Sequence, residues 1–507
     1  MHLTIDGAPV ALEELRNIWE GPCVITLGDA ARSRVQSAQA HVDAVIAGGK
    51  QVYGLNTGFG QLAQVRISDD ELAHLQENLI RSHAVGVGEL LPDEVVRLVM
   101  AMKVMALARG HSGVRPELID AICGLIEKEI FPCIPAKGSV GASGDLAPLA
   151  HMSCALLGLG EVRIGGEIVA ADKALEDAGL KPVVLAAKEG LALLNGTQVS
   201  TALALAAAFR SERLIAAAVT SGAMSADAIK GSDTPFDERI HDLRRHPGQI
   251  AVASLLRRLM DGSEIRASHV DCERIQDPYS IRCQPQVTGA CLDVLSHVMS
   301  VLHTEANSVT DNPLVFADAI LSGGNFHAEP VALAADYLAL SIAEIGALAE
   351  RRIALLIDSH MSGLPPFLVE DSGLNSGFMM AQVVAAALAS ENKALAHPAS
   401  VDSIPTSANQ EDHVSMATAA AYRLFAMLDN VANIVAIELL AATQGIDFHH
   451  PRKSSQVLED VMQRIRAVSP KYQQDRSLAP DIAAVVSMID AGDFCRHSES
   501  ILPSFTA

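Results

Sequence analysis

The chain has 507 residues and a formal net charge of -22 at pH 7. This charge argues against nucleic acids and anionic membranes as partners, because both bind basic surfaces. Hydrophobic residues make up 49% of the chain and aromatic residues only 4%, which excludes a disordered protein and favours a core of closely packed helices built from small aliphatic side chains.

The first 197 residues contain short sequence patterns of both strands and helices. Leu3–Ile5 precedes Asp6-Gly7, and Val162–Ile164 precedes Gly165-Gly166; each pattern predicts a β-hairpin. The capping-box sequence Ser68–Glu71 predicts the start of a helix between them. We therefore expect a small mixed N-terminal part.

After Asn195 the sequence becomes predominantly apolar in long stretches with few helix breakers. These stretches are apolar on more than one face, which is typical of helices buried on several sides in a long bundle or at an oligomer interface. They comprise residues 198–230, 286–309, 328–358, 374–398 and 412–445. We predict a mainly α-helical protein with an N-terminal subdomain at residues 1–197. Residues 198–507 form the long-helix bundle and a C-terminal helical cap.

The sequence favours a cytoplasmic protein without a catalytic metal. Its eight cysteines form no C-x-x-C pair, its N-terminus lacks the features of a signal peptide, and no uncharged apolar run reaches the ~20 residues that span a bilayer. We expect reduced thiols and no membrane association. The 18 histidines include no H-E-x-x-H motif, so we expect no metal at the site.

The segment Gly138–Ala147 contains the tripeptide Ala142-Ser143-Gly144. The amide nitrogen of Gly144 can attack the carbonyl carbon of Ala142, because glycine permits a close backbone approach. Loss of the Ser143 hydroxyl as water would then leave an exocyclic methylidene on a five-membered ring. The alternative is a glycine-rich turn or phosphate loop, although Asp145 stands where a phosphate loop requires lysine. The segment alone leaves both interpretations open.

Other polar segments lie between the apolar stretches and contain residues suited to a site around such an electrophile. The guanidinium of Arg282 is suited to bind a substrate carboxylate through two parallel hydrogen bonds, although a lone arginine also serves in surface ion pairs. Tyr53, in a glycine-rich segment, is suited to act as a base, although a packed ring is an equal alternative. Asn195-Gly196 is also consistent with a plain turn. His83 and Glu411 are ambiguous on their own.

Taken together, these segments resemble the aromatic amino-acid ammonia-lyases, in the same order from about residue 10 to about residue 445. The matching segments are Tyr53–Gly60, Gly138–His151, Asn195–Thr197, Gln276–Gln286, Glu305–Pro313, Gly323–Phe326, Asn375–Met379 and Ala408–Glu411. The resemblance implies a long central helical bundle of the fumarase/aspartase-like type. It also implies a homotetramer with active sites shared between subunits.

The resemblance further implies a self-made cofactor and a substrate. The cofactor is a 4-methylidene-imidazol-5-one formed from Ala142-Ser143-Gly144, and no external cofactor is expected. Ser82-His83 and Gln410-Glu411 are typical of the branch that converts L-histidine to trans-urocanate and ammonia. A branch that acts on tyrosine, phenylalanine or another ring amino acid, as a lyase or an aminomutase, is the alternative.

The family resemblance assigns roles to individual side chains. Tyr53 removes the β-proton, and Tyr279 assists proton transfer beside the electrophile. The residues expected to bind the substrate or line its pocket are His83, Asn195, Gln276, Arg282, Phe326 and Glu411. Among these, Arg282 pairs with the substrate carboxylate, while His83 and Glu411 hold the imidazole.

Overall fold

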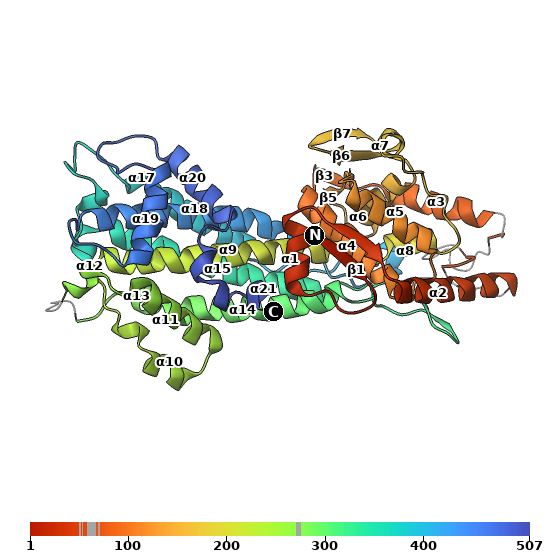
Figure 1. Ribbon diagram of the computed structural model, residues 1–507, viewed down its shortest axis with the longest axis horizontal. Coiled ribbons are helices and arrows are strands. Elements are labelled where there is room, and N and C mark those ends of the chain that lie inside the picture. Colours follow the sequence, from red (N-terminus) through yellow and green to blue (C-terminus); the bar gives the residue numbers. More distant parts are fainter. Residues whose placement is uncertain (50–51, 53, 58–66, 69–70, 270–274, 507) are drawn as a thin grey trace. The chain divides into compact units, whose positions relative to one another are not determined.

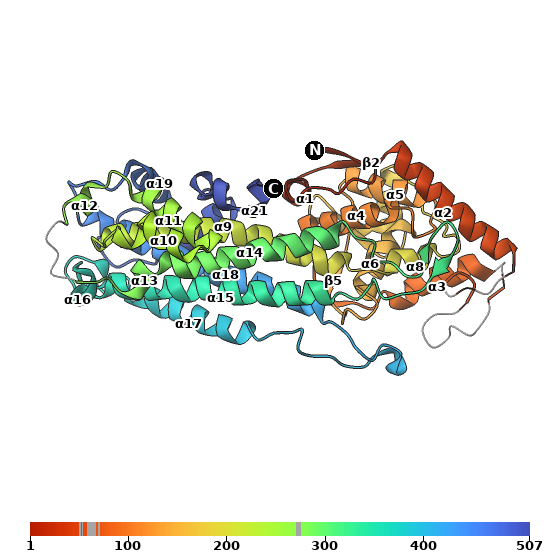
Figure 2. The same ribbon diagram turned by 90° about the horizontal axis from the view of Figure 1, so that it is seen from below.

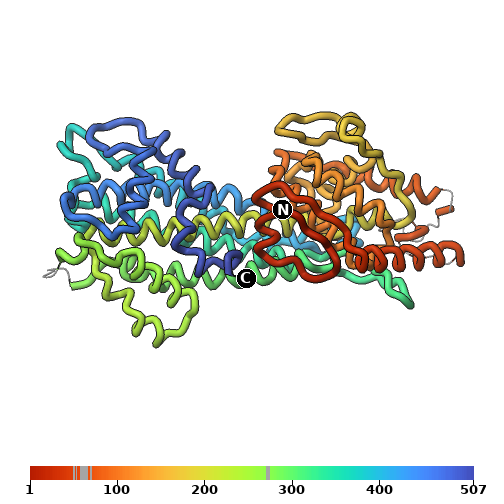
Figure 3. The backbone as a smooth tube through the Cα atoms, viewed as in Figure 1, coloured from red at the N-terminus to blue at the C-terminus, as the bar shows by residue number. Residues whose placement is uncertain are grey.

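The computed structural model describes residues 1–49, 52, 54–57, 67–68, 71–269 and 275–506 (Figure 1). The described chain forms two compact units, each assembled from three segments. Unit 1 comprises Met1–Ala206, Ser300–Asp336 and Pro398–Tyr422, and unit 2 comprises Ala207–Met299, Tyr337–His397 and Arg423–Ala507. Figure 3 lets the reader follow these segments along the backbone. The division predicted after residue 197 stays a prediction.

Unit 1 combines short strands with helices of moderate length. Its elements are β1 (His2–Ile5), α1 (Leu12–Glu20), β2 (Val24–Leu27), α2 (Asp29–Ala47), α3 (Leu72–His83), β3 (Val87–Leu90), α4 (Asp93–Ala108), α5 (Pro116–Glu127), β4 (Phe131–Pro132), β5 (Pro135–Lys137), α6 (Leu146–Leu156), β6 (Glu161–Ile164), β7 (Glu167–Ala170), α7 (Ala171–Asp177), α8 (Glu189–Leu194), β8 (Leu314–Val315), β9 (Ile320–Leu321) and η5 (Ser407–Asn409). Helix α4 packs against α1, α2 and α5. Every residue from Val95 to Ala108 is buried, so α4 is the core helix of this unit.

The two hairpin predictions have different outcomes. The prediction at Val162–Ile164 is confirmed, because β6 pairs antiparallel with β7 through the Gly165-Gly166 turn. The prediction at Leu3–Ile5 is wrong: β1 pairs in parallel with β2, after a connection that contains α1. Asp6 does not turn the chain back into a strand, because its carboxylate accepts the backbone amide of Ala31 in the first turn of α2 at 3.0 Å.

Unit 2 is built from helices and connecting loops, with no strand among its described residues. Its shorter elements are η3 (Thr234–Phe236), α10 (Glu238–Arg244), α11 (Pro247–Met260), α12 (Glu264–Ala267), α13 (Tyr279–Arg282), α16 (Ser359–Ser362), η4 (Pro366–Leu368), α17 (Met379–Leu395), α19 (Gln456–Val468), α20 (Ala479–Asp490), η6 (Cys495–His497), η7 (Glu499–Ile501) and α21 (Pro503–Thr506). Four longer helices contribute residues to both units: α9 (Gln198–Ala228), α14 (Gln284–Ala306), α15 (Glu329–Ile357) and α18 (Ala417–Asp447). The predicted long apolar segments are therefore confirmed as helices.

Within unit 2 the long helices pack side by side as a bundle (Figure 2). The Arg352 guanidinium of α15 forms a salt bridge with Glu438 of α18, at 2.5 Å from Nε to Oε1. Ser221 of α9 donates a hydrogen bond to the same carboxylate at 2.9 Å. Arg352 is 1% exposed and Glu438 is fully buried. Because two buried charges are tolerated only when they are paired and hydrogen-bonded, this contact favours one arrangement of the three helices.

Two of the long helices, α15 and α18, are long and apolar enough to cross a membrane by length and composition alone. Within their most apolar windows, however, 61% and 72% of the residues are already buried inside the protein. Helices that pack against one another in this way bury their apolar side chains inside the protein and need no lipid around them. Both are buried core helices, and the fold is the mainly α-helical bundle that the sequence predicts.

Candidate active site

The tripeptide Ala142-Ser143-Gly144 lies in the loop between β5 and α6, and we call residues 138–145 the electrophile loop. The Ser139 hydroxyl folds this loop on itself: it accepts the Gly141 amide at 3.2 Å and contacts the Gly144 carbonyl oxygen at 3.4 Å. Ala142 and Gly144 are buried, whereas Ser143 between them is half-buried. The side chain that would lose its hydroxyl is therefore the one that remains accessible.

Gly144 lies against Gly196, the residue after the predicted ligand Asn195. The two glycines form an isolated parallel β-bridge, and the Asp145 amide donates to the Gly196 carbonyl oxygen at 2.8 Å. Gly144 has a φ of +74°, and a Cβ atom on it would lie 2.1 Å from that same oxygen. Only glycine fits at this position, on both conformational and steric grounds. The backbone freedom that ring closure requires is thus present where the tripeptide needs it.

Asp145 ends the electrophile loop and anchors it to the first turns of other helices. Its fully buried carboxylate accepts hydrogen bonds from the Ser200 amide at 2.8 Å, the Ser200 hydroxyl at 2.9 Å, the Thr418 hydroxyl at 2.6 Å and the Ser139 hydroxyl at 3.1 Å. Burial raises the pKa of Asp145, and these hydrogen bonds oppose the rise. Ser200 and Thr418 lie in the first turns of α9 and α18, and Asp145 directly precedes the first residue of α6. The positive ends of these helix dipoles favour negative charge at the loop.

Glu411 lies directly beside the tripeptide. The Ser143 hydroxyl donates to Glu411 Oε1 at 3.1 Å, and the Thr406 hydroxyl donates to Oε2 at 2.7 Å. The backbones of Thr406 and Glu411 also form an antiparallel bridge, which fixes the carboxylate on a tight turn. The structure therefore brings together Ser143 and the carboxylate that the sequence suggested for an imidazole ring.

Asn195 is buried and has an unused acceptor. Its side-chain Oδ1 is buried and lacks a hydrogen-bond partner among the described residues. Its backbone carbonyl accepts the Lys103 ammonium at 2.7 Å, and the same ammonium reaches the Ala192 carbonyl at 3.2 Å. A buried polar atom without a partner is costly unless a ligand satisfies it. Asn195 is thus held through its backbone while its side chain remains available to a substrate.

His83 and Phe326 belong to the same unit. His83 is the last residue of α3, and its Nδ1 donates to the Leu79 carbonyl at 2.8 Å. Three residues later, the Cα of Gly86 lies 3.2 Å from the Cβ position of Gly138, where the electrophile loop begins. His83 therefore precedes a segment that packs on the loop. Phe326 is half-buried just before α15.

The remaining predicted ligands lie in unit 2. Gln276 and Arg282 line a pocket of about 440 Å³, together with Asp277, Cys283 and Gln286. The Arg282 guanidinium stacks on the Tyr279 ring, with 4.7 Å between the guanidinium carbon and the ring centroid. The Nε atom of Arg282 is buried without a hydrogen-bond partner among the described residues. The ring contact orients the guanidinium, and the role of Arg282 in binding a carboxylate stays a prediction.

Two residues remain to be placed, the predicted Tyr53 and the unpredicted Lys103. Tyr53, the predicted base, lies outside the described residues. Lys103 is not among the residues predicted from the sequence, although a single lysine within the apolar run of α4 is an unusual pattern. It is 1% exposed, and burial lowers its pKa to about 7, while Asp311 and Asp145 act in the opposite direction.

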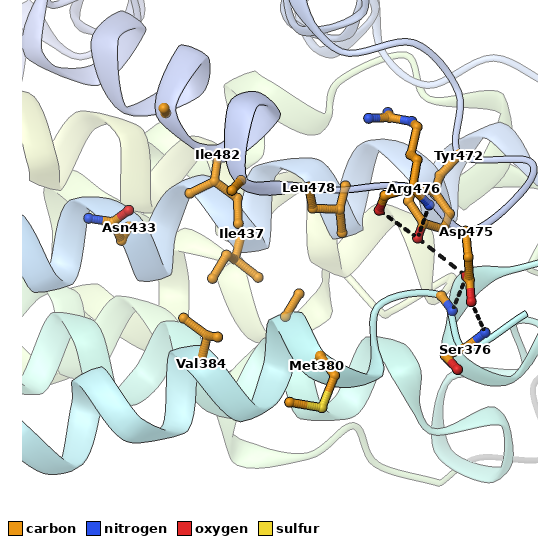
Figure 4. A pocket seen from close by; sticks show the side chains of 14 residues that line it. Ser376, Met380, Val384, Asn433, Ile437, Tyr472, Asp475, Arg476, Leu478 and Ile482 are labelled. Carbon is orange, nitrogen blue, oxygen red and sulfur yellow. Dashed lines mark hydrogen bonds between the residues drawn. The ribbon is translucent and has the colours of Figure 1, made fainter.

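A pocket of about 700 Å³ in unit 2 carries none of these residues (Figure 4). Its wall is mainly aliphatic, and its polar side chains other than that of Ser376 already have hydrogen-bond partners within the protein. Asp475 accepts the amides of Ser376 and Gly377 at 2.7 and 3.0 Å, and the Tyr472 hydroxyl at 3.3 Å. The two amides hold the pKa of Asp475 below its usual range. We therefore place no chemistry in this pocket.

Comparison with known proteins places these features in context. The model of the family described as "Aromatic amino acid lyase" matches residues 10–467. Histidine ammonia-lyase of Aromatoleum aromaticum is 59% identical over 490 residues, which cover 96% of this chain and 93% of that protein. The crystal structure of histidine ammonia-lyase from Trypanosoma cruzi is 40% identical with a TM-score of 0.91, covering 100% and 97% of the two chains. Tyrosine aminomutase from Streptomyces globisporus is 34% identical with a TM-score of 0.93, covering 98% of each chain.

Proposed function

The chain belongs to the aromatic amino acid lyase family, and from this premise we propose that it is a histidine ammonia-lyase. The reaction is the non-oxidative elimination of ammonia from L-histidine to give trans-urocanate. The observation that carries the choice of substrate is the contact between Ser143 and Glu411. A carboxylate beside the reacting group suits a polar imidazole, whereas it would be costly next to a phenyl ring that offers it no hydrogen bond.

The residues of the electrophile loop fit the prosthetic group that the family uses. Gly144 has the conformation and the lack of Cβ that ring closure needs, and Ser143 is accessible while its neighbours are buried. We propose that Ala142, Ser143 and Gly144 lose two water molecules to form 4-methylidene-imidazol-5-one. Once formed, the group supplies an electron-poor double bond, an electrophile that no standard side chain offers.

The other side chains have proposed roles in binding and proton transfer. Arg282 pairs with the substrate carboxylate, and its unpartnered Nε supports this role. The free Oδ1 of Asn195 accepts a hydrogen bond from the substrate. His83 and Glu411 hold the imidazole, while Phe326 packs close to the prosthetic group. Tyr53 removes the β-proton as a phenolate, which requires a pKa below the ordinary value of ~10.

Gln276 and Tyr279 belong to the proposed site because both lie close to Arg282. Gln276 lines the same pocket, and the Tyr279 ring lies under the guanidinium. We propose that both face the prosthetic group and that Tyr279 assists proton transfer. The 70% exposure of Tyr279 in a single chain is consistent with a surface that another subunit covers.

We further propose a cytoplasmic homotetramer with active sites shared between subunits. Helix α17 supports an oligomer, because Met379, Met380, Val383 and Val384 are exposed on it at helical spacing. An exposed apolar stripe of this kind usually marks a protein interface. Co-expression of Ser143→Ala with Arg282→Ala tests the sharing. Mixed tetramers that regain activity would support it, whereas mixtures as inactive as each variant alone would contradict it.

Two measurements test the proposed function. The first is ultraviolet detection of product from L-histidine, L-tyrosine and L-phenylalanine; urocanate as the preferred product supports the proposal. A preference for tyrosine or phenylalanine would favour the alternative, a lyase or aminomutase for another ring amino acid. The second is the intact mass of the purified protein, which should be lower than the sequence mass by two water molecules. Ser143→Ala should restore the sequence mass, and an active wild-type protein of unmodified mass would refute the self-made cofactor.

A further inference from the structure

Three potential metal ligands converge in unit 1, outside the residues assigned to the reaction. His327, Glu329 and His413 each offer one ligand atom, and these atoms all lie within 4.8 Å of one another. Glu329 is the first residue of α15, His327 lies two residues before it, and His413 comes from the segment before α18. We call these three residues the His-Glu-His cluster.

The contacts within the cluster leave its polar atoms poorly satisfied. The two imidazole rings stack nearly parallel, at an angle of 7° and a centroid separation of 5.7 Å. His327 Nε2 lies 3.4 Å from the backbone carbonyl oxygen of His413, which is long for a hydrogen bond. Glu329 Oε2 is buried and has no hydrogen-bond partner among the described residues. A buried carboxylate oxygen without a donor calls for a positive partner.

The ligand atoms of the cluster indicate which metal ions it suits. Two imidazole nitrogens and one carboxylate oxygen are typical ligands of zinc and of neighbouring transition metals. Mg²⁺ and Ca²⁺ prefer sites made entirely of oxygen. We propose that the His-Glu-His cluster binds a divalent transition-metal ion, with Zn²⁺ as the best match. Three protein ligands leave one tetrahedral position for water or another small ligand.

The cluster lies next in sequence to two residues of the proposed site. His327 directly follows Phe326, and His413 lies two residues after Glu411, which contacts Ser143. A bound ion would therefore tie together two segments that carry proposed substrate-binding residues. It would restrict the movement of Glu411 without taking part in the elimination. The effect on turnover rests on the proposed function, whereas metal binding does not.

Zn²⁺ binding to tag-free protein tests the proposal. The full chain is treated with a chelator, exchanged into metal-free buffer without histidine, and titrated with Zn²⁺ by calorimetry. We expect one saturable site per chain, and affinity reduced at least ~10-fold in Glu329→Gln and in the double variant His327→Ala/His413→Ala. His246→Gln, at an exposed histidine of unit 2, is the matched control and should bind like the wild type.

Two further measurements distinguish this site from a cysteine site and from an effect of the elimination chemistry. Co²⁺ bound to nitrogen and oxygen ligands should give visible absorption without a thiolate charge-transfer band, and Cys283→Ser should retain binding. Ser143→Ala lacks the electrophile precursor but keeps the cluster, so it should bind Zn²⁺ normally even if the proposed reaction is wrong. Circular dichroism of each variant confirms that it is folded. Equal Zn²⁺ affinity in the wild type and the folded double variant, or no saturable site in the wild type, would overturn the proposal.

Discussion

The Ser143 hydroxyl donates a hydrogen bond to Glu411 across 3.1 Å, although the two residues are 268 positions apart in the chain. The tight turn at Thr406 holds this carboxylate in place. In the proposed mature site Ser143 has lost this hydroxyl, and Glu411 hydrogen-bonds the substrate imidazole instead. Because a hydrogen bond to a charged group contributes about 1.5–3 kcal/mol, Glu411→Gln should lower kcat/KM for L-histidine by roughly 10–100-fold. Steady-state kinetics and intact mass together separate lost substrate binding from lost cofactor formation.

Asp412→Asn is the control for Glu411→Gln, because Asp412 is the exposed neighbouring residue. It removes a nearby charge without touching Ser143 and should leave kcat/KM unchanged. A Glu411→Gln protein with full activity on L-histidine would show that the carboxylate plays no part in recognising the ring.

Tyr53→Phe should retain the fold and the affinity for substrate but lose most of the turnover. A positioned proton-transfer group typically contributes ~10²–10⁴-fold, so kcat should fall within that range. Binding of L-histidine by calorimetry and kcat by product absorbance provide the two readouts. Near-normal turnover would remove Tyr53 as the base.

Gly196→Ala tests the contact between the electrophile loop and the Asn195 segment. Gly196 has a φ of +126°, and a Cβ atom there would lie 2.4 Å from Gln198 Oε1 and 2.8 Å from Thr310 Oγ1. Strain at such a position costs about 1–3 kcal/mol. We expect a lower midpoint of thermal unfolding and incomplete loss of the two water molecules by intact mass. Gly21→Ala should change neither, because a Cβ at Gly21 has no atom within 4 Å and its φ is not positive.

Asp145→Ala should destabilise unit 1 strongly. It leaves the buried donors of Ser200 and Thr418 without their acceptor, and each unsatisfied buried group costs about 1–3 kcal/mol. Urea unfolding should show a loss of about 3 kcal/mol or more. Asp177→Ala, at an exposed position in the last turn of α7, should stay within about 0.5 kcal/mol of the wild type. Equal losses in the two variants would contradict the anchoring role of Asp145.

The burial of Lys103 predicts that the free energy of unfolding increases with pH. Its pKa falls from 10.5 to about 7 on folding, chiefly through burial. Between these values the unfolded chain binds more protons than the folded protein, so folding becomes more favourable as pH rises from about 7 towards 10.5. The slope is at most about 1.4 kcal/mol per pH unit.

The comparison of the wild type with Lys103→Met isolates this contribution from other titrating groups. We expect the thermal midpoint of the wild type to rise relative to that of the variant between pH 7 and pH 9.5. A difference that does not change with pH would mean that Lys103 keeps its proton throughout this range.

The sequence predicts the helical bundle well because long apolar segments with few breakers have few other stable conformations. Helix α9 occupies residues 198–228, where the apolar pattern predicts a helix at 198–230. The predicted hairpin at Leu3–Ile5 is wrong because Asp6-Gly7 is typical of turns, while the capping contact of Asp6 with Ala31 depends on tertiary structure.

The candidate site is predictable only in part, for the same physical reason. The resemblance pointed to Ser143 and Glu411 separately, but their hydrogen bond depends on folding and no local pattern encodes it. Lys103 and the anchoring of Asp145 likewise arise from burial, which the residue types alone do not specify. Tyr53 and the roles of the substrate-binding residues stay predictions.

The anchoring of Asp145 also constrains when, during synthesis of the chain, the electrophile loop can reach its final geometry. Its carboxylate needs Ser200 and Thr418, so the electrophile loop cannot adopt its final geometry on the ribosome until residue 418 has been made. Glu411, which meets Ser143, is synthesised almost as late. A nascent chain that ends before residue 418 thus carries the complete tripeptide without the contacts that anchor its loop. In the proposed maturation, ring closure at Ser143 would therefore follow the folding of segments that lie far downstream of the tripeptide.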